Sequence, residues 1–121
     1  MIAIQIEYEN FQEFISREPV SVLLCIDSRD RTSCQLLKQL ADVADEFVSG
    51  ISFAWIDIAS IPETVITEID CNVTPSLMFF RGGQIVENAS ETGYHRVVKT
   101  LCRSNILSWF GKTDGGATLV C

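Results

Sequence analysis

Residues 72–86 read NVTPSLMFFRGGQIV, in which a proline precedes an apolar run, a pair of glycines and a second apolar run. The runs PSLMFF and QIVEN predict two β-strands, and the Arg-Gly-Gly between them is typical of a hairpin turn. Only the 53–63 segment, FAWIDIASIPE, is comparably specific, and it predicts a strand that leads into a helix. These two segments therefore predict a strand, a helix, a loop and a hairpin in that order.

Two further strands are predicted upstream of these segments. VSVLLCI (residues 20–26) is apolar nearly throughout, which is typical of a strand in a parallel sheet covered on both faces. IAIQIE (residues 2–7) alternates apolar and polar residues, as a half-buried strand does. The chain therefore begins with a strand and places a fully buried strand early in the fold.

Helices are predicted between these strands and after the hairpin. Apolar residues recur at helical spacing after Thr32, and Thr32 with Gln35 has the capping-box pattern that makes Thr32 the N-cap. An earlier helix is predicted from Asn10 until Pro19 ends it. Residues 93–107, GYHRVVKTLCRSNIL, predict a closing helix. The complete order is βαβαβαββα, which consists of a crossover half, a hairpin and a last helix.

This order, with its punctuating residues, resembles the thioredoxin family over residues 2–102, most specifically in the 53–63 and 72–86 segments. The resemblance implies an α/β, thioredoxin-like three-layer fold in which a central mixed β-sheet is flanked by helices. We expect one domain over residues 1–110. A glycine-rich, flexible C-terminal tail is expected over residues 111–121.

The resemblance gives a role to Thr74 and Pro75. Pro75 is expected to follow a cis peptide bond, a minority state that proteins keep where a tight turn is needed. In the family this loop lies beside the active site and grips extended peptides. The backbone of Thr74 would face such a peptide, so Thr74 and Pro75 are candidate substrate-binding residues.

The active-site pattern of the family is incomplete in this sequence. The family's reaction needs two cysteines in a C-x-x-C arrangement, because one thiolate attacks a substrate disulfide and the second resolves the mixed disulfide. Residues 31–34 read RTSC, so Arg31 occupies the attacking position and only Cys34 is kept. Asp30 replaces the usual aromatic residue, and Cys25 replaces the family's buried acid. The resemblance therefore implies no efficient disulfide reductase activity.

Cys34 is the candidate catalytic residue, and two interpretations of it remain open. The start of a helix and Arg31 present positive charge that favours a reactive thiolate, whereas Asp30 adds negative charge to the same turn. The second position of a helix also points inward, and a buried thiol in apolar surroundings is inert. We favour an inert, packed Cys34.

The pattern of cysteines predicts no metal site. The chain has five, Cys25, Cys34, Cys71, Cys102 and Cys121, with no C-x-x-C pair and a single histidine, so no zinc site is predicted. We expect mostly free thiols, with Cys25 as a small core residue. Cys71 is expected in an exposed loop. Its pairing with Cys34 under oxidation is the less favoured alternative.

Composition and hydropathy disfavour nucleic acids and membranes as partners. The formal net charge is −7, which disfavours nucleic acids because phosphate binding needs clustered lysines and arginines. No apolar run approaches the ~20 residues of a membrane span, and no signal peptide is recognised. We therefore expect a cytoplasmic protein that contacts neither nucleic acid nor membrane and needs no cofactor or metal.

Three functional hypotheses follow. The favoured one is a protein- or peptide-binding module that is not an enzyme, in which Thr74 and Pro75 form a groove and Asp30 and Arg31 form a charged recognition patch. The alternative for these two charged residues is a solvated loop. The second hypothesis is a single-cysteine thiol–disulfide oxidoreductase or oxidant sensor that uses Cys34. The third is a homodimer that uses Trp109 and the last helix.

Overall fold

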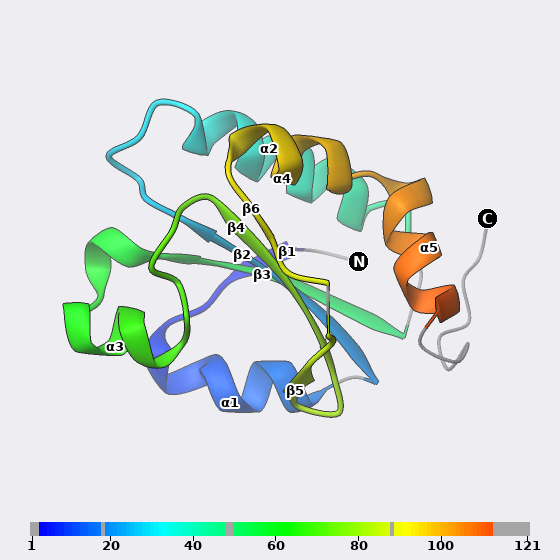
Figure 1. Ribbon diagram of the computed structural model, residues 1–121, viewed down its shortest axis with the longest axis horizontal. Helices are drawn as coiled ribbons and strands as arrows, with labels where there is room; N and C mark the ends of the chain where they lie inside the picture. Colours follow the sequence, from blue (N-terminus) through cyan, green and yellow to red (C-terminus); the bar gives the residue numbers. More distant parts are fainter. Residues whose placement is uncertain (1–2, 18, 48–49, 88, 113–121) are drawn as a thin grey trace.

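The computed structural model describes residues 3–17, 19–47, 50–87 and 89–112 of the 121-residue chain. Strands and helices alternate along most of it (Figure 1). Their bounds are β1 (Ala3–Gln5), α1 (Tyr8–Arg17), β2 (Val20–Ile26), α2 (Ser33–Ala44), β3 (Ile51–Asp57), the short 3₁₀ helix η1 (Ile58–Ser60), α3 (Glu63–Glu68), β4 (Ser76–Arg81), β5 (Gln84–Ile85), β6 (Glu91–Thr92), α4 (Tyr94–Thr100) and α5 (Arg103–Lys112).

The strands form one mixed sheet in the order β1-β3-β2-β4-β5. Strands β1, β3 and β2 run parallel, whereas β4 is antiparallel to β2 and pairs with both β5 and β6. The α/β architecture with a central mixed sheet is therefore confirmed. The short 3₁₀ helix η1 and the short strand β6 are additional to the predicted order.

Helices cover both faces of the sheet, with α2 and α4 on one face and α1 and α3 on the other (Figure 1). The side chains of β2 alternate between two apolar clusters. Val22 and Leu24 pack in the cluster that includes α2, whereas Leu23 and Cys25 pack in the cluster that includes α1. Every residue of β2 is buried, so the prediction of a strand covered on both faces is confirmed.

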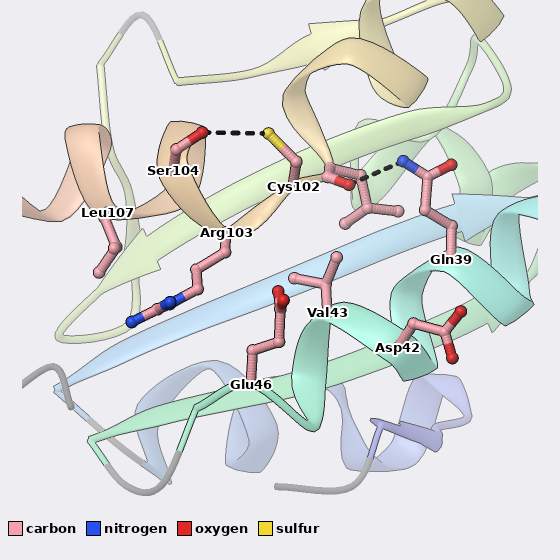
Figure 2. A pocket seen from close by; sticks show the side chains of 9 residues that line it. Gln39, Asp42, Val43, Glu46, Cys102, Arg103, Ser104 and Leu107 are labelled. Carbon is pink, nitrogen blue, oxygen red and sulfur yellow. Dashed lines mark hydrogen bonds between the residues drawn. The ribbon is translucent and has the colours of Figure 1, made fainter. Parts of the chain in front are cut away.

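The closing helix predicted over residues 93–107 is divided into α4 and α5. Leu101 leaves the helical conformation with ψ 66°. The side-chain amide of Gln39, on α2, donates to the backbone oxygens of Val98 (2.9 Å) and Leu101 (2.7 Å), the second of which is drawn in Figure 2. These carbonyls would otherwise lack partners at the helix end. A long-range contact from α2 therefore stabilises the break.

The end of α5 packs back on the sheet. Trp109 stacks on Phe79, with ring centroids 6.0 Å apart, so its indole belongs to the core packing. Helix α5 extends to Lys112 and so includes the first two residues of the expected tail. Residues 113–121 lie outside the described ranges. The homodimer that uses Trp109 stays a prediction.

Candidate functional site

Two loops leave the sheet at the same edge. The antiparallel register of β2 and β4 places Cys25 opposite Ser76. Residues 27–32 follow β2 and residues 72–75 precede β4, so the two loops are neighbours, because adjacent strands lie about 4.8 Å apart. Figure 1 shows both at the end of the sheet where α2 begins. The candidate residues on the two loops therefore share one edge of the molecule.

The 72–75 loop combines a buried and an exposed part. The peptide bond between Thr74 and Pro75 is cis, the state that the resemblance implies. Pro75 is buried and its carbonyl oxygen accepts from the N–H of Gly93 at 2.9 Å, whereas Thr74 is half-buried. The neighbouring Val73 is 56% exposed. Val73 is an exposed apolar residue of the candidate site that the sequence did not indicate, since a single valine in a polar loop gives no periodic signal.

Hydrogen bonds within the 27–32 loop organise it. Nε and Nη2 of Arg29 each donate to the carboxylate of Asp27 at 2.8 Å. The carboxylate of Asp30 accepts from both the N–H and the hydroxyl of Thr32 at 3.1 Å. Thr32 is the N-cap of α2, as predicted, but its hydroxyl makes no cap bond, so the predicted capping box with Gln35 is wrong. The competing acceptor, Asp30, takes the hydroxyl instead.

Two carboxylates beside this loop have lowered pKa values. The side-chain hydrogen bond from Arg29 holds the pKa of Asp27 below its usual value. Partial burial acts to raise the pKa of Asp57, but hydrogen bonds from the amides of Ser28 and Ala59, both 3.0 Å, outweigh it and lower the pKa. Both carboxylates therefore favour the charged form in the folded state.

Solved structures with a similar arrangement include thioredoxins. The oxidised thioredoxin from Plasmodium falciparum matches with a TM-score of 0.68 and 12% identity, over 93% of this chain and 98% of that one. Thioredoxin f2 of Chlamydomonas reinhardtii gives 0.70 and 11%, over 95% and 99%. This chain has the thioredoxin fold. Zinc-bound human ERp44 gives 0.72 and 21%, over 89% of this chain and 32% of ERp44. No family model and no curated protein sequence matches.

Within this thioredoxin fold, Cys34 is the second residue of α2 and is exposed. Ser33 is buried instead, and its hydroxyl donates to the carbonyl oxygen of Asp27. The expectation that Cys34 packs inward is therefore wrong, since Ser33 takes the buried position. The reactivity of the Cys34 thiol stays a prediction. Asp30 and Arg31 are also exposed, on the same turn as Cys34.

Cys25 and Cys71 form a disulfide bond, with Cα atoms 6.3 Å apart, and both are completely buried. The predictions of a free core thiol at Cys25 and an exposed one at Cys71 are wrong, and so is the alternative pairing of Cys71 with Cys34. Cys25 faces the layer of α1 and α3, where the N–H of Cys71 donates to the carbonyl of Ile66 at 2.9 Å. Helix α2, which carries Cys34, covers the opposite face.

A hollow of about 650 Å³ lies between the second half of α2 and the corner of α4 and α5 (Figure 2). The thiol of Cys102 lies at its wall, with Sγ 3.6 Å from the hydroxyl oxygen of Ser104. Since α2 is about 18 Å long, this hollow and Cys34 lie near opposite ends of the helix. Cys102 is thus a second free thiol, remote from the two loops, and a natural control for Cys34.

The described residues offer no metal-binding group of three or more His, Cys, Asp and Glu side chains. In the same part of the chain, no helix has the length and apolar character needed to cross a bilayer.

Stability should fall in acid and Asp57 should contribute to the fall. A carboxylate whose folded pKa is lowered stabilises the fold above its unfolded pKa of about 3.9 and loses that effect as the pH falls through the folded value. We expect Asp57→Asn to flatten the drop in the urea midpoint between pH 7 and about pH 3. The control is Asp42→Asn on α2, which removes an exposed charge remote from the loop. An equal drop of the urea midpoint in wild type and in Asp57→Asn contradicts the contribution of Asp57 to stability.

Proposed function

We propose that this chain is a cytoplasmic thioredoxin-fold module that binds an extended protein segment and does not catalyse dithiol exchange efficiently. Cys34 supports the second part, since it is the one exposed free cysteine among the residues that the structure describes. Arg31 precedes Cys34 by three residues, and Cys25 and Cys71 are bonded to each other in the opposite layer. A single thiol can attack a disulfide, but it depends on an external thiol to resolve the mixed disulfide.

One observation supports the binding part: the exposed Val73 beside the half-buried Thr74, next to the hydrogen-bonded 27–32 loop. An apolar contact with a polar rim is the usual anatomy of a protein interface. An extended segment can be held there by backbone hydrogen bonds at Thr74, with an apolar side chain on Val73. Asp30 and Arg31 supply charge of both signs on the rim.

Val73→Asp should weaken binding at least about tenfold, because it introduces a charge at the apolar contact. Peptides are first selected from a phage-displayed random library on the wild-type protein, and their affinities are then measured with each variant. Ile85→Asp is the matched control, since Ile85 on β5 is a 45% exposed apolar residue outside the two loops. Equal affinity of Val73→Asp and wild type, or equal loss in both variants, contradicts the proposed surface.

A second candidate is a single-cysteine redox protein, which the exposure of Cys34 at the start of α2 favours. Its thiolate would attack a disulfide and form a mixed disulfide, and glutathione would release it. Turnover of hydroxyethyl disulfide with glutathione distinguishes the two candidates. Activity that is lost in Cys34→Ser and kept in Cys102→Ser supports the redox protein, whereas peptide binding that survives Cys34→Ser supports the module.

A further inference from the structure

Cys25 is connected to both ends of the 72–75 loop. Its side chain is bonded to Cys71, the residue before the loop. Its backbone pairs with Ser76, the residue after the loop, in the β2–β4 ladder. Both ends of the four-residue loop are therefore held at one buried residue of the sheet, Cys25.

The disulfide is buried, so it is not part of the surface at Val73 and Thr74 that would contact a peptide. Cys25 and Cys71 are both 0% exposed and pack in the cluster that contains Ile56, Ile69 and Met78. A reductant can reach the sulfur atoms only after the loop or its surroundings open. Helix α2 with Cys34 covers the other face, so Cys34 is not placed to exchange with this bond.

Only one end of the loop depends on the disulfide. At the Ser76 end, the β-ladder and the bond from the N–H of Gly93 to the carbonyl of Pro75, 2.9 Å, persist in either redox state. At the Cys71 end, the N–H of Cys71 bonds to the carbonyl of Ile66, and Asn72 and Val73 that follow are exposed. Reduction removes the covalent tether at this end and leaves the backbone bond of Cys71 and the 3.3 Å bond from the hydroxyl of Thr67 to the side-chain oxygen of Asn72, so the end that carries Val73 loosens.

We propose that the Cys25–Cys71 disulfide is a redox-controlled clip that holds the 72–75 loop in its peptide-binding form, so that reduction weakens binding at the groove. The inference rests on the proposed function, whose site it regulates. A dithiol reductant attacks one sulfur to give a mixed disulfide, and its second thiol then displaces the protein. The protein gains two electrons and two protons as two thiols, and the reductant becomes a disulfide.

Binding and reduction must affect each other equally. If reduction weakens peptide affinity by some factor, a bound peptide shifts the reduction equilibrium of the disulfide by the same factor. A loop held in its bound form loses less conformational freedom on binding, which is why the oxidised protein should bind more tightly. A factor of about ten lies within the usual range of such couplings.

Hydrogen exchange tests the clip without any ligand. In a chain in which Cys34, Cys102 and Cys121 are replaced by serine, we compare the oxidised protein with the protein reduced by dithiothreitol. We expect exchange of the Cys71 amide, which is bonded to the carbonyl of Ile66, to rise at least about tenfold on reduction, while the β2–β3 ladder keeps its protection. Equal exchange of the Cys71 amide in the two states overturns the proposal. If far-UV circular dichroism shows that reduction unfolds the chain, Cys25→Ala with Cys71→Val replaces the reduced state.

Peptide affinity tests the regulation separately. The probe is a phage-selected peptide that binds the oxidised protein, and we expect its Kd to rise about tenfold on reduction. A loop that loosens without any change in Kd overturns the proposal. If the loop loosens but no peptide can be selected at all, the clip is supported and the proposed function fails.

Discussion

Reduction of the Cys25–Cys71 bond should lower the free energy of unfolding by about 4 kcal/mol. The two cysteines are 46 residues apart in sequence, so the bond removes a large loop from the unfolded ensemble. In the chain-entropy account, a loop of this length corresponds to about that free energy. In this account the effect arises in the unfolded state, and it is separate from the local loosening of the 72–75 loop in the folded state.

Urea unfolding of the oxidised and reduced protein measures this effect. The midpoint should fall on addition of dithiothreitol in wild type, in Cys34→Ser and in Cys102→Ser, since neither free thiol takes part in the bond. Cys71→Val should show a low midpoint whether or not the reductant is present. An unchanged wild-type midpoint after complete reduction, verified by thiol counting, would mean that the bond does not constrain the unfolded chain.

Elements with a strong local pattern could be predicted from the sequence. The β2 strand is apolar except for Ser21 and is buried on both faces, because its side chains alternate between two helical layers. The hairpin turn at Arg-Gly-Gly could also be predicted from local sequence, because Gly82 and Gly83 adopt positive φ values of 60° and 85°. Glycine adopts this left-handed region without the clash that a Cβ atom causes.

Features that depend on distant contacts could not be predicted. The break between α4 and α5 depends on Gln39, which is 59 residues away from Val98. The Cys25–Cys71 pair depends on the fold bringing one sheet face and one loop together. The exposure of Cys34 accompanies the burial of its neighbour Ser33, whose hydroxyl donates to the backbone carbonyl of Asp27. Sequence spacing carries no signal for any of these contacts.

Arg31→Cys should give the chain measurable disulfide reductase activity. The substitution places a thiol three residues before Cys34, on a turn closed by the bond from the N–H of Ser33 to the carbonyl of Asp30, 3.2 Å. The new thiolate can attack a substrate disulfide, and Cys34 can then resolve the mixed disulfide, leaving an internal disulfide for dithiothreitol to reduce. Because resolution becomes intramolecular, insulin reduction should rise at least about tenfold above wild type.

Two control variants separate the thiol from the charge. Arg31→Ser removes the cation without adding a thiol, and Arg31→Cys combined with Cys34→Ser permits attack but no internal resolution. Both should stay at the wild-type rate. The decisive contrary result is an Arg31→Cys protein that mass spectrometry shows to form the internal disulfide with Cys34 but that still does not accelerate insulin reduction. The missing thiol would then not be what limits insulin reduction, and we would look for the limit in the neighbouring 72–75 loop, which must accept the substrate chain before sulfur chemistry can begin.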